Sequence, residues 1–244
     1  MKKMLTFAKR NAKEIVRDPL SIIFGLGFPL VLILLLSAIQ ANIPVSLFEI
    51  PSLAPGVAVF GLSFITLFSA TLISRDRSTA LLQRLYTTPL TPRDFILGYT
   101  LPLIPLSLAQ GVVTYIAAII LGLDITPNIT LALALLIPVS AFYIALGLLF
   151  GSILTDKQVG GICGALLTNL SAWLSGVWFD LGLVGGVFEA IANALPFVHA
   201  VELERAAISG AFGDIVPHLL VVLGYAIAAT AASIYLFLRQ MKKQ

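Results

Sequence analysis

Six long stretches without a single Asp, Glu, Lys or Arg dominate this sequence and limit what it can fold into. The charges lie in the shorter segments between them. A transmembrane helix needs roughly 20 predominantly apolar residues to cross the hydrocarbon core of a bilayer, and each stretch is long enough. The sequence therefore predicts six membrane-spanning helices, near residues 21–41, 54–74, 96–122, 129–154, 159–179 and 216–238.

The composition excludes an ordinary water-soluble protein. Of the 244 residues, 59% are hydrophobic and 11% are charged, and the mean hydropathy is +1.01, whereas soluble domains carry about 25% charged residues. With a single cysteine, Cys163, the chain cannot form an intrachain disulfide, and a four-ligand zinc site has too few Cys and His residues. We expect an all-α polytopic membrane protein that forms one transmembrane domain over residues 1–244.

The basic residues predict the orientation of the spans. Fourteen of the fifteen Lys and Arg residues fall on one side of the predicted topology, and only Arg205 falls on the other. Cytoplasmic segments of membrane proteins carry an excess of Lys and Arg. We therefore expect a multi-pass protein of the plasma membrane with both termini in the cytoplasm.

The N-terminal segment has helical periodicity before the first span. Within residues 1–18, apolar positions follow helical spacing, and Lys9, Arg10, Lys13 and Arg17 lie elsewhere on the helical wheel. This pattern predicts an amphipathic helix at the membrane surface, or a basic leader that only sets the topology, and the two are compatible. A cleaved signal peptide is the alternative, but its polar lead is too long.

The cytoplasmic connection between the second and third spans is patterned as a helix over residues 75–88. Ser78 or Thr79 can cap it and Pro89 ends it. Its arginines and its apolar patch are Arg75, Arg77, Leu81, Leu82, Arg84 and Leu85. We expect either an amphipathic elbow on the inner leaflet or a helix that docks a cytoplasmic partner. Thr91, Pro92 and Asp94 then predict the start of the next helix.

The outer segment at residues 181–213 is mostly apolar but is interrupted by Pro196. Neither half is long enough to span a bilayer, so we expect a re-entrant or interfacial helical hairpin. Within it, Glu202 and Arg205 are three residues apart and can pair, which we favour over a direct role in transport.

Small residues within the spans predict close contacts between helices. Gly147 with Gly151, and Gly160 with Gly164, each form a small-xxx-small pair, which can serve local packing or a subunit interface. Asn169, at the centre of the fifth span, needs a hydrogen-bond partner or a water-lined cavity. We consider it a candidate for a transport path, with ordinary hydrogen bonding between helices as the alternative.

Two side-chain stripes complete the candidate path. The second span offers Phe60, Phe64 and Phe68 at intervals of one helical turn, and the fifth span offers Asn169 and Trp173 in the same way. Aromatic residues at this spacing also pack between helices or face lipid, so both interpretations stay open. Because the predicted spans contain no basic side chain, the path favours a hydrophobic or amphipathic cargo.

Motifs for catalysis are missing. The sequence contains no Gly-Lys pair, and therefore no P-loop, and it contains no H-E-x-x-H or G-x-S-x-G motif. The conceivable nucleophile and base are an outer serine such as Ser209 with His199 or His218, and no motif supports them. His218 is also the only histidine or charged residue in the predicted spans, which argues against an ion-coupled carrier.

The order of these features resembles the ABC-2 type permeases. The resemblance rests on the amphipathic leader, the segment R-D-R…L-L-Q-R-L-Y-T-T-P-L at 75–90 and the outer N-A-L-P-F-V-H-A-V-E at 193–202. It extends over essentially the whole chain. Two positions depart from the family: Ala80 stands where a glycine is frequent, and Phe179-Asp180 replaces an aromatic-Pro pair.

The resemblance implies a transmembrane subunit of an ABC exporter. It implies pairing with a second permease chain, in a homodimer or heterodimer, and with two separate ATPase subunits that hold ATP and Mg, so that this chain carries no cofactor and contacts no nucleic acid. Residues 75–86 would correspond to the family's coupling helix, and the second and fifth spans would line the path. The alternatives are an ion-coupled secondary transporter and a non-transporting membrane scaffold or enzyme.

Overall fold

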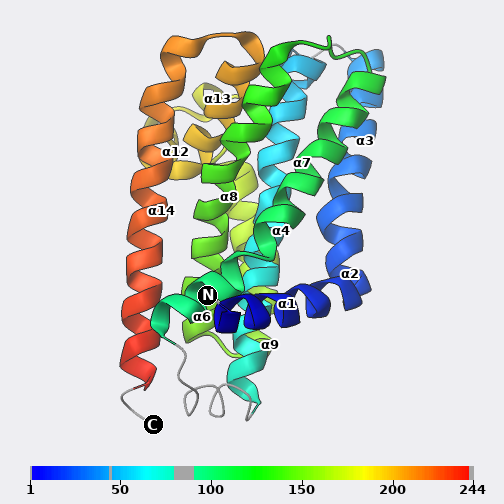
Figure 1. The fold of residues 1–244 in the computed structure, drawn as a ribbon. Coiled ribbons are helices and arrows are strands. Elements are labelled where there is room, and N and C mark those ends of the chain that lie inside the picture. Colours follow the sequence, from blue (N-terminus) through cyan, green and yellow to red (C-terminus); the bar gives the residue numbers. More distant parts are fainter. Residues whose placement is uncertain (1, 44–45, 80–90, 242–244) are drawn as a thin grey trace.

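The computed structural model describes residues 2–43, 46–79 and 91–241, and over these residues the secondary structure is entirely helical (Figure 1). The expected all-α architecture is confirmed. The elements before residue 80 are α1 (Lys2–Arg17), α2 (Pro19–Ile22), η1 (Ile23–Gly27), α3 (Phe28–Asn42), η2 (Ser46–Phe48) and α4 (Ile50–Ser78). Those after residue 90 are α6 (Pro92–Thr100), α7 (Leu103–Ile120), α8 (Pro127–Ile153), α9 (Asp156–Val159), η3 (Gly160–Leu167), α10 (Thr168–Trp173), α11 (Leu181–Val184), α12 (Gly186–Ala194), α13 (Pro196–Ser209) and α14 (Phe212–Met241).

Within the described chain, five helical segments are long and apolar enough to cross a membrane, at residues 23–42, 50–78, 93–120, 127–153 and 212–236. They coincide with the first, second, third, fourth and sixth predicted spans. The helices α12 and α13 together would make a sixth, but they are bent by 73° at their junction. The chain is therefore a multi-pass membrane protein. Its first and last described residues lie at one end of the bundle, which we call the terminal end (Figure 1).

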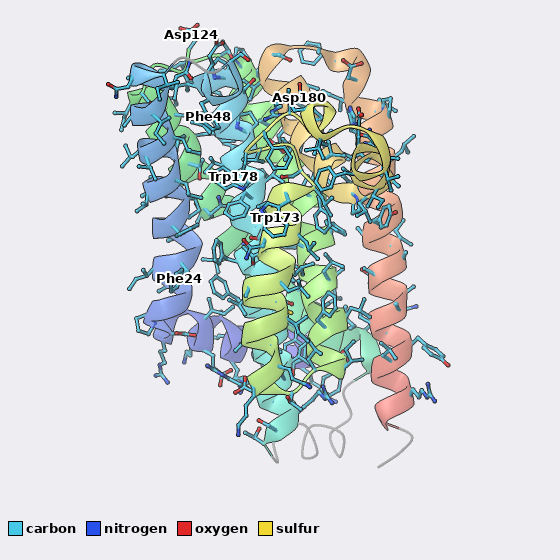
Figure 2. All side chains as sticks on the ribbon, turned by 180° about the vertical axis from the view of Figure 1, so that it is seen from behind. Phe24, Phe48, Asp124, Trp173, Trp178 and Asp180 are labelled. Carbon is cyan, nitrogen blue, oxygen red and sulfur yellow. The ribbon has the colours of Figure 1, made fainter. Side chains whose placement is uncertain are left out.

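The fifth predicted span, at 159–179, is shorter in the structure than expected. The consecutive segments α9, η3 and α10 form one helical run from Asp156 to Trp173, and its central part, Gly160–Leu167, is π-helical. The chain then turns at Gly176, whose φ of +70° suits a residue without a Cβ. Figure 2 shows the consequence: the run stops near Trp173, and the helices of the outer segment lie beyond it. A run of apolar residues could not reveal this turn.

The outer segment is broken where Pro196 predicts. Pro196 is the first residue of α13, where a missing backbone N–H costs no helical hydrogen bond. The second arm, α13, packs against α4, α8 and α14. It buries Phe197, Val201 and Leu203 in the main hydrophobic core. This half of the predicted hairpin is thus an integral part of the bundle.

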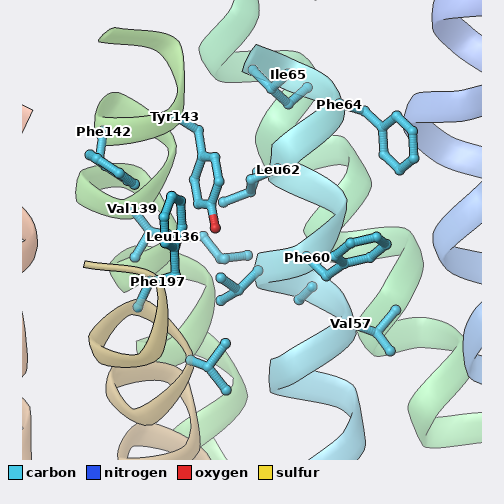
Figure 3. Close-up of a cluster of buried hydrophobic side chains, with 14 of the residues drawn as sticks. Val57, Phe60, Leu62, Phe64, Ile65, Leu136, Val139, Phe142, Tyr143 and Phe197 are labelled. Atoms are coloured by element: carbon cyan, nitrogen blue, oxygen red, sulfur yellow. The ribbon is translucent and has the colours of Figure 1, made fainter. Parts of the chain in front are cut away.

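The core is organised around α4, the most buried of the candidate spans. On one face, Leu62 and Ile65 pack with Leu136, Val139 and Tyr143 of α8 (Figure 3). The helices α4 and α8 can approach closely because Gly147 and Gly151 of α8 have no side chain. A Cβ at either position would collide with α4. The prediction of local packing is therefore confirmed for this pair. For the second pair, a Cβ at Gly160 would meet nothing within 4 Å, and a role in a subunit interface stays a prediction.

The predicted N-terminal amphipathic helix is confirmed as α1, which runs across the terminal end of the bundle (Figure 1). Its buried side includes Phe7, Ala8, Asn11 and Ile15, which lie on one face of the helix. Leu5 is 52% exposed, although it is apolar and lies at helical spacing from the buried Ala8. The face of α1 that contacts the bundle thus includes the polar Asn11 and excludes the apolar Leu5. It is rotated relative to the face that contains only apolar residues.

Candidate functional site

The last turn of α4 connects several helices at the terminal end. We define the α4 junction as the four residues Ser74, Arg75, Asp76 and Arg77. Their side chains reach α1, α6, α9 and the end of α8. The junction lies directly before residues 80–90, which are outside the described part of the chain.

Asp76 is the buried centre of the junction, with 3% of its surface exposed. Arg10 of α1 donates to both of its carboxylate oxygens, at 2.7 and 2.8 Å, and the Tyr99 hydroxyl of α6 donates to Oδ2 at 2.8 Å. Burial alone would lower the pKa of Arg10, but its hydrogen bond and charge interaction with Asp76 outweigh burial and raise it. A buried carboxylate with these partners is satisfied and fixes three helices relative to one another.

Arg77 binds backbone carbonyl groups at the end of α8. Its Nη1 donates to the carbonyl of Gly151 at 2.9 Å and to that of Leu154 at 3.1 Å. The last carbonyls of a helix lack partners within the helix and carry a partial negative charge, so a guanidinium is well placed there. The predicted docking residue Arg77 therefore has a structural role, whichever partner the junction meets.

Arg75 is the accessible member of the junction. Its side chain is 60% exposed, and its Nε lies 3.6 Å from Oδ1 of Asp156, itself 45% exposed. Ser74 also donates to this oxygen, at 3.4 Å. Contacts of this length between exposed groups are weak, so Arg75 can exchange Asp156 for another anionic partner.

The remaining predicted docking residues Leu81, Leu82, Arg84 and Leu85 lie outside the described residues. Residues 75–78 of the predicted coupling helix form the last turn of α4, where the Ser78 hydroxyl donates to the carbonyl of Arg75 at 2.8 Å. The helix predicted to follow is confirmed as α6. Thr91 and Asp94 form its capping box.

Sequence reasoning missed the partners of Asp76. Arg10 is 66 residues away along the chain, and Tyr99 had no visible signal. A second connection, also missed, joins α1 to α6, where Asn11 donates to the carbonyl of Gly98 at 2.9 Å. One sign of this contact was present in the sequence, because Asn11 is a polar residue beside the apolar stripe of an amphipathic helix.

The structure separates the two stripes of the candidate path. Phe60, Phe64 and Phe68 are each no more than 8% exposed. Figure 3 shows Phe60 and Phe64 projecting from α4 on the side opposite to Tyr143. There they meet the first span: Phe28 packs against both rings.

The stripe of the fifth span, by contrast, is open. Trp173 is 51% exposed, and Asn169 is also exposed. The Asn169 amide donates to the carbonyl of Ala165 at 2.8 Å within the same helical run. One chain therefore does not bring the two stripes together on one surface.

Polar residues at the opposite end of the bundle pair with one another. Arg205 binds Glu202 at 2.8 Å, which confirms the predicted pair, and it also donates to the carbonyls of Ser52 and Gly176. Nδ1 of His199 lies 2.8 Å from Nδ1 of His218.

The serine considered as a nucleophile, Ser209, donates to the carbonyl of Ala206 at 3.4 Å. A carboxylate that sequence reasoning did not single out, Glu204, is fully buried and accepts a hydrogen bond from Tyr115 at 2.9 Å.

These observations define a multi-pass helical membrane protein whose amphipathic N-terminal helix is locked to the end of its second span. The model of the family described as "ABC-2 type transporter" matches residues 2–209. The chain belongs to this family, and its resemblance to the ABC-2 permeases is thereby confirmed. Members are transmembrane subunits, generally non-catalytic, that associate with ABC ATPases. The match ends before α14, and comparison with curated proteins gives no match.

Proposed function

We propose that this chain is the permease subunit of an ABC exporter, working with a second permease chain and two separate ATPase subunits that bind ATP and Mg. The observation that carries the proposal is the α4 junction. It joins the start of the segment expected to meet the ATPase, residues 75–88, to α1, α6 and α8 through polar contacts of 2.7–2.9 Å, and to α9 through a weaker contact of 3.4 Å.

The geometry of the junction suits the transmission of force. A displacement of the segment after α4 would pull on Asp76 and Arg77, whose partners lie on α1, α6 and α8. Partly buried, charge-assisted hydrogen bonds of 2.7–2.9 Å resist separation more than apolar contacts, which can slide. ATP-driven closure of the partner subunits would therefore move several spans together.

The cargo proposed for this exporter is hydrophobic or amphipathic. In the candidate spans the charged residues lie near the helix ends, so no described basic side chain offsets the desolvation of a charged cargo in mid-membrane. Asn169 and Trp173 are the exposed candidates for contact with it. Phe60, Phe64 and Phe68 would border the path only if the first span moved away from α4.

The proposed orientation places both termini in the cytoplasm. Cysteines at Ser78 and Ser209, which are both exposed and lie at opposite ends of the bundle, test it in a Cys163→Ser background. We expect an impermeant thiol reagent added to intact cells to label Ser209→Cys and not Ser78→Cys. Labelling of Ser78→Cys alone would show that the chain has the opposite orientation in the membrane.

The docking proposal predicts that Leu82→Asp or Leu85→Asp abolishes co-purification with the ATPase and at least about 90% of ATP-driven transport, because a charge replaces an apolar contact. Ser78→Asp is the matched control, since it adds the same charge nearby without removing an apolar side chain. If both leucine variants retain ATPase binding and transport, the segment is only an elbow on the membrane.

The path proposal predicts that Asn169→Ala changes substrate-stimulated ATP hydrolysis more than basal hydrolysis. Phe64→Ala serves as the comparison. A residue that only packs against Phe24 and Phe28 should affect both rates through stability, whereas a residue that also lines the path should affect the stimulated rate selectively. Equal effects of Asn169→Ala on both rates would remove it from the path.

A further inference from the structure

The π-helical segment η3 shifts the faces of the fifth helical run by one residue. Val159 and Cys163 are buried four residues apart, and the next buried residue of the run is Thr168, five residues further on. A regular α-helix would bring residue 167 back to the buried side instead. Because a π-helix closes its hydrogen bonds over five residues, the segment holds in effect one extra residue.

This extra residue decides which side chains α10 exposes. Asn169 and Trp173 share one side of α10, which we call the open face, and Trp173 is 51% exposed at the end of the run (Figure 2). If η3 were α-helical, α10 would turn by about 100°, the angle between successive residues, and each residue would move to the place of the next. Thr168 and Ala172 would then occupy the open face.

Glycines make the backbone of η3 easy to convert. The segment begins with Gly160 and Gly161, and a Cβ at either position would meet nothing within 4 Å. Close packing therefore does not explain why these residues lack side chains. Glycine adopts many backbone conformations and favours the α-helix less than alanine does. Two glycines thus reduce the preference of this segment for the α-helical form.

Side chains replace backbone hydrogen bonds where η3 ends. The Thr168 hydroxyl donates to the carbonyl of Cys163 at 3.0 Å, and the Asn169 amide donates to that of Ala165 at 2.8 Å. The backbone N–H of Thr168 also donates to Ala165, whereas an α-helix would use residue 164. Conversion would exchange these contacts for regular backbone bonds, so the carbonyls have partners in both forms.

The two ends of the run are held differently. Near the terminal end, Val159 and Cys163 pack with Ala70 of α4. At the other end, one side-chain hydrogen bond in the described part of the chain joins α10 to another helix, between Ser171 and the Tyr143 hydroxyl of α8 at 2.9 Å. Rotation of α10 would therefore break a single polar contact, while the start of the run stays attached to α4.

We propose that η3 is a two-state switch that turns α10. In the π-helical form the open face presents Asn169 and Trp173 to the cargo. In the α-helical form it presents Thr168 and Ala172, so an amide and a large ring are exchanged for a hydroxyl and a methyl group, and the cargo loses contacts. The switch rests on the path proposed above and adds a movement that releases the cargo when ATP-driven motion of α4 reaches the start of the run.

Thiol reactivity of the full chain in mixed micelles tests the rotation. Single cysteines replace Trp173 or Ala172, which is 5% exposed, in a Cys163→Ala background. We expect Trp173→Cys to react with N-ethylmaleimide at least about tenfold faster than Ala172→Cys. Gly160→Ala/Gly161→Ala favours the α-helical form and should lower this ratio at least about threefold, because residue 172 moves to the open face.

The matched control is Gly213→Ala/Gly224→Ala in α14. It makes the same two substitutions at helical glycines where a Cβ would also meet nothing within 4 Å. The reactivity ratio should stay within about 1.5-fold of the natural one, since α14 contains no extra residue. A ratio that Gly160→Ala/Gly161→Ala leaves unchanged, or that the control lowers equally, would overturn the proposal.

Deletion of Gly161 tests the role of the switch in transport. It removes the extra residue, so the run can be α-helical throughout while Asn169 and Trp173 keep the open face. We expect this chain to keep the natural reactivity ratio and to co-purify with the ATPase, but to lose at least about 90% of ATP-driven transport. Transport at the natural rate would overturn the switch. If the natural complex exports nothing, the proposed function fails, and the reactivity ratios of the chain alone still decide whether η3 converts.

Discussion

Replacing Gly147 with alanine should lower the free energy of unfolding by about 2–3 kcal/mol, the upper range for overpacking a tight core. A Cβ at this position would collide with Ser69 and would lie 2.5 Å from the carbonyl oxygen of Thr66. Because one obstacle is backbone, α4 and α8 would have to separate. Their separation would also weaken the hydrogen bond from the Thr66 hydroxyl to the carbonyl of Tyr143. Unfolding in mixed detergent micelles, followed by circular dichroism, measures the change.

Gly160→Ala is the matched control for this prediction. It makes the same substitution in a helical glycine, but a Cβ there would meet nothing within 4 Å. We expect its stability to stay within about 0.5 kcal/mol of the natural chain or to rise, because alanine favours helical backbone over glycine. If Gly147→Ala were equally tolerated, the contact between α4 and α8 would not be as tight as the structure has it.

Replacing Asp76 with alanine should lower the free energy of unfolding by about 2–3 kcal/mol. Removing one partner of a buried ion pair costs about 3–5 kcal/mol, because it strands the other charge. Here the Arg10 side chain is 33% exposed and recovers part of that cost by hydration. Tyr99 also loses its buried acceptor. The same detergent unfolding experiment measures the effect.

The control for Asp76 is the neighbouring acid Asp156. Its contact with Arg75 is 3.6 Å long, and both side chains are about half exposed, so Asp156→Ala should cost less than about 0.5 kcal/mol. Within the proposed function, Asp76→Ala should also lower transport per ATP hydrolysed at a temperature where the variant is folded. Similar stability losses for Asp76→Ala and Asp156→Ala would contradict the buried network.

Hydrophobicity and charge were sufficient for most of the fold. A polypeptide in lipid must satisfy its backbone hydrogen bonds internally, so charge-free apolar stretches of more than 20 residues have one structural solution, the helix. The sequence also predicted correctly where some helices begin, because capping residues and proline affect the backbone in their own neighbourhood. Thr91 and Asp94 begin α6, and Pro196 begins α13.

The fifth span shows where this reasoning fails. The stretch from residue 158 to residue 179 contains no charged residue, but the helix ends at Trp173. The chain turns at Gly176, and the absence of charge along the stretch gives no sign of where the helix stops. The sequence also could not show which way Phe60, Phe64 and Phe68 face. When every side of a transmembrane helix is apolar, the side that faces protein cannot be told from the side that faces lipid.

The sequence by itself thus determined the helices, the predicted topology and the family resemblance, because lipid imposes these on a single chain through composition and order. Only the tertiary structure decided what the charged residues do. It brought Arg10 to Asp76 across 66 positions and assigned Arg77 to the end of α8. Such contacts depend on distance in space, and the energy of a charge is set by its partners and its burial, which no spacing along the chain records.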